Sequence, residues 1–199
     1  LCIGEKQCFV VDSVADELKR EMLAYSAVEL DRRQIEALTK VALPLGDDGK
    51  PHVNRDFVGR NANVLAASIG LKLDDQLRLL IGETDAKHAF VEVEQMMPFL
   101  PIIRVRNVEE GIRAAIESEH GYRHTAIIHS RNIENMHNMA RAVDTTVFVK
   151  NGPSFAGLGV GGEGYATFSI AGPTGEGMTT ARTFTRRRRC ALIDYFRIT

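Results

Sequence analysis

The side chain best suited to covalent chemistry near the start of the chain is Cys2, in the segment Leu1-Cys2-Ile3-Gly4-Glu5-Lys6. A thiolate can attack a carbonyl carbon and form a covalent intermediate. Cys2 lies outside any apolar run and directly before a predicted strand. Cys8 and Cys190 lie within apolar runs and are predicted to be small core residues. Cys2 is therefore the candidate nucleophile, although an inert thiol is the commoner outcome for such a residue.

Two carboxylates, Glu92 and Glu94, form a second candidate pair. If the chain is extended there, both side chains lie on one face, since side chains alternate along a strand. They could then work as an acid and a base, but a single carboxylate that binds hydroxyl groups is the simpler interpretation. The segment Glu94-Gln95-Met96-Met97-Pro98 is apolar and irregular after its carboxylate, which is typical of a loop that faces a cofactor.

The remaining motifs favour structural roles. The glycine-rich run from Gly157 to Gly162 does not join a strand to the start of a helix, so a flexible or close-packed loop is favoured over a phosphate site. The arginines 186–189 would alternate in direction along a strand, which favours a salt-bridged edge or a subunit contact over nucleic-acid binding. The six histidines are scattered and predict no metal site, and a pH-active role for His124 is less expected than a structural one.

Composition limits the classes of function. The chain has 199 residues, of which 44% are hydrophobic and 26% charged, as in ordinary globular proteins. A net charge of −1 gives no electrostatic reason to expect nucleic acid or an anionic membrane as a partner. The three cysteines predict neither a disulfide framework nor a metal site, which indicates a reducing, cytosolic compartment. Because the chain starts on Leu1 rather than Met, we expect it to be part of a longer protein.

The hydrophobic pattern alternates between strands and helices. Strands are predicted at 7–12, 78–82, 102–105, 125–129 and 145–149. Helices are predicted at 13–25, from near 31 until Pro44, at 61–69, at 108–118 and at 132–142. Ser13-Val14-Ala15-Asp16 is expected to form a capping box and Asn132 a cap. Regular structure is expected to stop at 151–177, and 179–199 is strand-like. Strands that alternate with helices of this length predict parallel βαβ units and an α/β fold.

Taken together, the motifs resemble those of one family. Cys2-Ile3-Gly4-Glu5-Lys6, Glu94-Gln95-Met96-Met97-Pro98, His124-Thr125-Ala126 and the segment 170–177 occur in the order and at the spacing of CoA-acylating aldehyde dehydrogenases. The chain is most similar to the C-terminal half of the propionaldehyde and acetaldehyde dehydrogenases of bacterial microcompartments, over essentially all of its length. The resemblance implies a three-layer, Rossmann-like catalytic domain of the aldehyde dehydrogenase fold with a mostly parallel sheet.

The resemblance also implies roles for individual residues. Cys2 would attack the aldehyde, hydride would pass to NAD+, and coenzyme A would take the acyl group from the thioester on Cys2. Glu94 matches the glutamate that binds the nicotinamide ribose hydroxyls, and Met96 stands where a residue packs near the nicotinamide. Leu1 and Ile3 would line the aldehyde pocket, with Ile170 opposite them. No metal is implied.

For the organisation of the chain, the resemblance implies a catalytic, nucleophile-bearing domain at 1–180 and a C-terminal strand segment at 181–199 that serves oligomerisation. The NAD-binding domain is absent from this chain, so the fragment is expected to be inactive alone. The expected partners are a short-chain aldehyde, coenzyme A and further copies of the same chain, with a microcompartment shell as another candidate and neither nucleic acid nor membrane. The expected location is the cytoplasm, inside a bacterial microcompartment.

Two alternative functions stay open at this point. The first is a hydrolytic aldehyde dehydrogenase that releases the free acid, because the position of its glutamate base would precede Leu1. The second, from a different class, is a non-catalytic α/β module that carries an inert thiol and acts in assembly.

Overall fold

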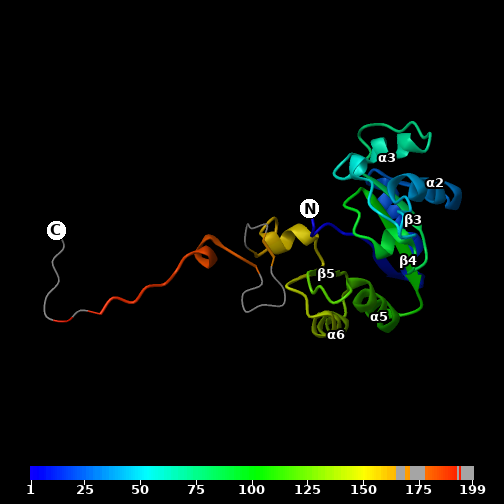
Figure 1. Ribbon diagram of the computed structural model, residues 1–199. Coiled ribbons are helices and arrows are strands. Elements are labelled where there is room, and N and C mark those ends of the chain that lie inside the picture. Colours follow the sequence, from blue (N-terminus) through cyan, green and yellow to red (C-terminus); the bar gives the residue numbers. More distant parts are fainter. Residues whose placement is uncertain (165–168, 171–177, 192, 194–199) are drawn as a thin grey trace.

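The computed structural model describes residues 1–164, 169–170, 178–191 and 193. Two groups of parallel strands with helices around them form the body of the molecule, and the described part of the C-terminal segment extends away from that body (Figure 1). Among the described residues, no helix is long and apolar enough to cross a membrane.

The larger sheet has four parallel strands. Their order is β1 (Cys8–Val11), β4 (Phe99–Val105), β3 (Leu79–Glu83) and β2 (Ala27–Glu29). A second, two-stranded parallel sheet joins β5 (Thr125–Ile128) to β6 (Val147–Lys150). The predicted α/β fold with a mostly parallel sheet is therefore confirmed.

Helices cover both faces of the larger sheet, which gives three layers. Because side chains alternate along a strand, Leu80 and Ile81 of β3 enter different hydrophobic clusters. The Ile81 cluster packs against α1 (Asp12–Ala24). The Leu80 cluster includes buried side chains of α2 (Arg32–Ala42), α3 (Ala62–Ser68) and the short helix α4 (Ala89–Glu92). The other described helices are α5 (Val108–Glu119), α6 (Ile133–Val143) and the 3-10 helices Arg55–Phe57, Ser154–Leu158 and Ala181–Phe184.

The helix starts are mostly fixed by side-chain caps. Asp31 accepts a hydrogen bond from the backbone N–H of Gln34 while the Gln34 side chain accepts one from the Asp31 N–H, a reciprocal capping box. Asn132 caps α6, as predicted. The capping box predicted at Ser13 is wrong. Pairing with β4 keeps the chain in the strand as far as Val11, and α1 starts at the next residue, so Val11 takes the cap position without a polar side chain.

Two short elements were not predicted. The edge strand β2 has three residues and pairs with β3, and it is too short to show a period in the sequence. The helix α4 ends at Glu92, and the chain from Glu94 onward is an irregular loop. The expectation that Glu92 and Glu94 could share one face of an extended segment is therefore wrong, whereas the irregular loop at Glu94 is confirmed.

The strand predicted for the C-terminal segment is wrong for its described residues. Residues 178–191 and 193 contain the 3-10 helix Ala181–Phe184 and an isolated bridge from Met178 to Ile170, but no strand. A strand needs a neighbour to accept and donate its backbone hydrogen bonds, and this segment leaves the body instead (Figure 1). Cys190, predicted to be a core residue, is exposed for the same reason. Residues 192 and 194–199 lie outside the described part.

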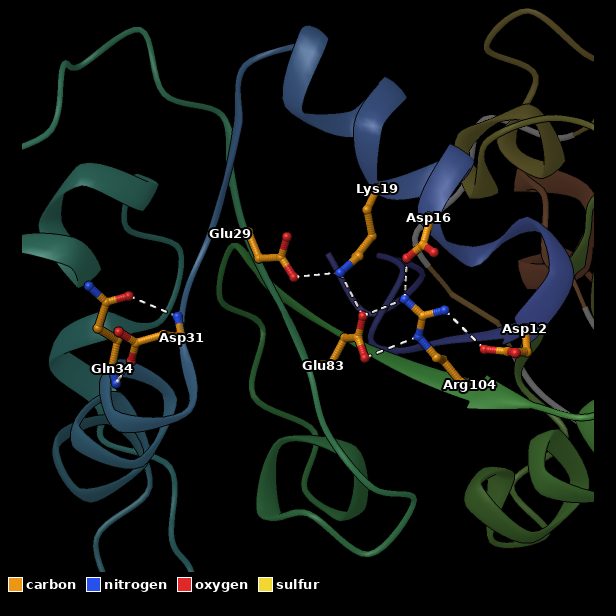
Figure 2. A network of polar contacts seen from close by, with 8 residues as sticks. All are labelled: Asp12, Asp16, Lys19, Glu29, Asp31, Gln34, Glu83 and Arg104. Atoms are coloured by element: carbon orange, nitrogen blue, oxygen red, sulfur yellow. Dashed lines mark hydrogen bonds and ion pairs between the residues drawn. The ribbon is translucent and has the colours of Figure 1, made fainter.

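A network of charged side chains joins α1 to the carboxyl ends of three strands (Figure 2). Glu83, the last residue of β3, accepts hydrogen bonds from Arg104 at 2.8 and 3.1 Å and from Lys19 at 2.6 Å. Arg104 also pairs with Asp12 and Asp16, and Lys19 with Glu29. The hydrogen bonds from Arg104 are the largest cause that lowers the pKa of Glu83, to about 2.

This network predicts a specific acid sensitivity. Because the pKa of Glu83 is lower in the folded chain, its stabilising effect is complete above about pH 4.5 and is lost as the pH falls toward about 2. We expect Glu83→Gln to lower the free energy of unfolding at neutral pH by about 1 kcal/mol or less, since the side chain is part-exposed. Urea unfolding of both forms at several pH values should show their difference shrinking on acidification. A difference that stays constant with pH would contradict this role of Glu83.

Candidate active site

The two segments predicted to carry chemistry meet at one edge of the larger sheet. Strands β1 and β4 are hydrogen-bonded neighbours and run parallel, with Cys8 opposite Ile102. The residues before each strand therefore emerge at the same, amino-terminal edge. Cys2 precedes β1 and Glu94 precedes β4, so the sheet brings together residues that are far apart in the sequence.

Cys2 is exposed on a tight turn. The backbone N–H of Gly4 donates a hydrogen bond of 2.9 Å to the carbonyl oxygen of Leu1, which closes the turn around Cys2. The next side chain, Ile3, is only 2% exposed and fastens the turn to the body. Cys2 is thus exposed to solvent on a turn whose backbone is anchored by the buried Ile3. A nucleophile needs both accessibility and a fixed position.

Two charged side chains tie the turn to separate elements. Glu5 accepts a hydrogen bond of 2.8 Å from the backbone N–H of Ser154, at the start of the 3-10 helix in the glycine-rich segment. Lys6 donates a hydrogen bond to the carbonyl oxygen of Val91 in α4. The turn is therefore held between these two elements. From sequence, Glu5 and Lys6 were recognisable only as parts of a motif, and Ser154 carries no signal of its own.

Lys6 links the Cys2 turn electrostatically to Glu92 and Glu94, which lie at the end of α4 and in the loop that follows it. Burial is the largest influence on the Lys6 ammonium and lowers its pKa, while the charges of Glu92 and Glu94 act in the opposite direction. Lys6 is therefore part-buried and within electrostatic range of both carboxylates. Glu92 is also near His120, at 3.8 Å, and Lys87, at 3.6 Å.

The loop that carries Glu94 is fixed by a buried amide. Gln95 is 1% exposed, donates to the carbonyl oxygen of Phe99 at 3.0 Å and accepts from the N–H of Met97 at 2.9 Å. Met96 has a φ of 50°, in the left-handed region that is unusual for a side chain of its size. Its carbonyl oxygen accepts from the N–H of Gly59 at 3.1 Å. Glu94 and Met96 are exposed on this clamped loop, where a cofactor could contact them.

The residues predicted to line the aldehyde pocket differ in their exposure to solvent. Leu1 is 61% exposed, whereas Ile3 is buried. Ile170 is partly buried and forms the isolated bridge with Met178, and the motif residues 171–177 lie outside the described part. Their place around a substrate stays a prediction.

The glycine-rich segment is close-packed where the structure describes it. A Cβ atom on Gly164 would lie 2.0 Å from the carbonyl oxygen of Gly157, so the two backbone stretches approach too closely for any side chain. Ser154 and Leu158 of the 3-10 helix that contains Gly157 are buried. These contacts favour the close-packed interpretation of this loop.

The other candidate groups have structural surroundings. Cys8 is partly buried and packs against the Ile81 cluster, and burial raises its pKa to about 11. His124 contacts the hydroxyl of Thr125 at 2.6 Å, and its backbone N–H donates to Glu119. Across the described ranges, no group of three or more acidic, histidine or cysteine side chains could hold a metal ion.

Comparison with solved structures identifies the class of protein to which this fold belongs. Propionaldehyde dehydrogenase of Rhodopseudomonas palustris with bound propionyl-CoA has a TM-score of 0.88 and 44% sequence identity, and the match covers 95% of this chain and 41% of that one. A second structure of that enzyme, with bound CoA and an acylated cysteine, has a TM-score of 0.87 at 43% identity, over 94% of this chain and 42% of that one. An engineered glycolyl-CoA reductase with bound NADP+ has a TM-score of 0.87 at 44% identity, over 95% of this chain and 42% of that one. The fold is therefore that of this part of an aldehyde dehydrogenase.

Comparison of sequences shows which aldehyde dehydrogenases the chain is related to. No family model matches the chain. Acetaldehyde dehydrogenase (acetylating) EutE of Salmonella typhimurium is 57% identical over 199 residues, which is all of this chain and 43% of that protein. The chain is thus homologous to part of the CoA-acylating aldehyde dehydrogenases, and the predicted resemblance is confirmed. It spans less than half the length of the relatives it matches.

The three thiols should differ in reactivity toward iodoacetamide. Only the thiolate reacts rapidly, and the Cys8 thiol is partly buried with a raised pKa. Near pH ~7.5 we expect the exposed Cys2 and Cys190 to be alkylated while Cys8 reacts at least ~10-fold more slowly until urea unfolds the chain. Peptide mass spectrometry over time would measure each site. Alkylation of Cys8 in the folded chain as fast as that of Cys190 would show that its surroundings are wrongly described.

Proposed function

We propose that this chain is the catalytic part of an NAD-dependent, CoA-acylating aldehyde dehydrogenase. The reaction would oxidise a short-chain aldehyde, propionaldehyde or acetaldehyde, to its acyl-CoA. The observation that carries the proposal is that an exposed, anchored Cys2 turn and a clamped Glu94 loop precede the neighbouring parallel strands β1 and β4 at one edge of the sheet. The acylated cysteine and bound CoA of the R. palustris relative support it.

The chemistry of Cys2 follows from its exposure. Its thiolate would attack the carbonyl carbon of the aldehyde and form a thiohemiacetal. A bound NAD+ would accept the hydride, which leaves an acyl thioester on Cys2. The thiolate of coenzyme A would then take the acyl group and release Cys2 for the next cycle. Leu1 and Ile3, with Ile170 opposite, would line the aldehyde pocket.

The cofactor role of Glu94 fits its surroundings. Its side chain is exposed, and among the described residues no ion pair involves it, so both oxygens can accept hydrogen bonds from a ribose diol. Met96, exposed on the same loop, would contact the nicotinamide. Because Gln95 fixes the loop, the carboxylate would orient the cofactor without much movement.

The wider organisation belongs to the same proposal. Residues 1–180 would form the nucleophile-bearing domain, and 181–199 would take part in oligomerisation, with a separate domain supplying the rest of the NAD site. The enzyme would work in the cytoplasm, inside a bacterial microcompartment, with the shell as a candidate partner. The resemblance to microcompartment enzymes supports this placement.

Loss of the thiol should abolish turnover. In the full-length protein we expect Cys2→Ala to eliminate acyl-CoA formation and to leave NAD+ affinity nearly unchanged, because the small side chain does not disturb the turn. Cys190→Ser is the matched control and should remain active. Product analysis with and without coenzyme A would also separate acyl transfer from release of the free acid. If Cys2→Ala keeps more than a trace of activity, Cys2 is not the nucleophile.

Loss of the carboxylate charge at Glu94 should slow hydride transfer. A loosely held nicotinamide would reach the reactive geometry less often, so we expect Glu94→Gln to reduce the rate of NADH formation roughly 10- to 100-fold. Glu92→Gln, with the neighbouring carboxylate removed, is the control. Single-turnover absorbance of NADH would measure both. An unchanged hydride-transfer rate together with a lost pH dependence of thiol attack would make Glu94 a general base instead.

A further inference from the structure

We propose that Lys6 is a positioning residue for the nicotinamide cofactor, holding the Glu94 loop against the Cys2 turn and balancing the charge of Glu94. This inference rests on the proposed function, because it concerns the same site. It assigns to Lys6 the relative placement of the nucleophile and the cofactor-binding carboxylate.

Lys6 connects the Cys2 turn mechanically to α4. Lys6 follows the Cys2 turn directly, and its ammonium group donates to the carbonyl oxygen of Val91. Val91 and its neighbour Phe90 are both 0% exposed, and Phe90 belongs to the hydrophobic cluster on that face of the sheet. The acceptor is thus part of a rigid support. Lys6 therefore sets the separation between the Cys2 turn and the end of α4, from which the Glu94 loop continues.

Lys6 also interacts electrostatically with the carboxylates near the end of α4. Lys6 lies within range of Glu92 and Glu94, and its part-buried position strengthens these interactions relative to water. Glu92 has a further cationic neighbour, Lys87 at 3.6 Å, and also lies 3.8 Å from the ring of His120. Within the described ranges, no such ion pair reaches Glu94. Lys6 can therefore balance the charge of Glu94 from a distance, while the carboxylate oxygens stay open to a diol.

A separate contact fixes the opposite side of the Cys2 turn. Glu5 is bonded to the N–H of Ser154, so the Cys2 turn is already fixed against the glycine-rich segment. With that contact intact, losing the charge of Lys6 would leave the turn in place and release mainly the Glu94 side. The cofactor should then bind more weakly, whereas the folded structure and the exposure of Cys2 should change little.

The test is a double-mutant cycle in the full-length protein, read by calorimetry with NAD+ alone. We expect Lys6→Met and Glu94→Gln each to weaken NAD+ binding roughly 10-fold, and the double variant to be no weaker than Glu94→Gln, since residues that act through one another are not additive. Lys6→Arg should stay within about 3-fold of the wild type because it keeps the charge. Lys6→Gln removes the charge and carries its donor nitrogen on a side chain one atom shorter than that of lysine, so it should behave like Lys6→Met. Glu92→Gln is the control and should bind normally.

Specific outcomes would overturn this role. If Lys6→Met and Glu94→Gln weaken binding additively, Lys6 does not act through Glu94. If Lys6→Met or Lys6→Gln lowers only the melting temperature and leaves NAD+ affinity unchanged, Lys6 is a structural residue. The cycle uses nucleotide affinity alone, so it remains readable if the wild type binds NAD+ but forms no acyl-CoA, which would overturn the proposed function. A wild type that does not bind NAD+ would overturn both.

Discussion

The parallel pairing of β1 with β4 is the constraint on which the candidate site depends. Because the two strands run side by side in the same direction, the Cys2 turn and the Glu94 loop that precede them emerge at one edge of the sheet. Ligands of open α/β sheets usually bind at the carboxyl ends of the strands. In this chain the carboxyl edge holds the ion network of Glu83 and Arg104 (Figure 2). The candidate nucleophile lies at the amino edge, before β1.

The amino edge is held by polar contacts rather than by apolar burial alone. Ile3 anchors the Cys2 turn by burial. The turn is also held by two charged side chains, because Glu5 bonds to the backbone N–H of Ser154 and Lys6 to the backbone carbonyl oxygen of Val91. On the facing loop, the buried amide of Gln95 performs the same task. A hydrogen bond to a fixed backbone group defines a position more narrowly than apolar contact does. Such contacts can keep the exposed thiol of Cys2 and the exposed carboxylate of Glu94 in fixed positions relative to the sheet.

The sequence predicted those parts of the fold that depend on local chemistry. The apolar period of α2 and the cap at Asn132 appear in neighbouring residues, and so does the alternation of strands and helices. The failures involve partners distant in the chain: β2 exists because β3 pairs with it, and the pairing of β1 with β4 ends at Val11, one residue before the predicted end of the strand, so that α1 starts at Asp12. The same limit applies to the site. The motif drew attention to Cys2 and Glu94, but nothing local indicates that Lys6 bonds to Val91 or Glu5 to Ser154.

In the proposed reaction, the turn at the amino edge of β1 carries the acyl intermediate. The most direct measurement is mass spectrometry of the full-length protein after incubation with propionaldehyde and NAD+ in the absence of coenzyme A, when the acyl group has no acceptor. The account predicts a propionyl adduct on the peptide that contains Cys2, which disappears when coenzyme A is added and propionyl-CoA forms. Formation of propionyl-CoA with the adduct on another residue, or with no adduct on Cys2, would contradict it.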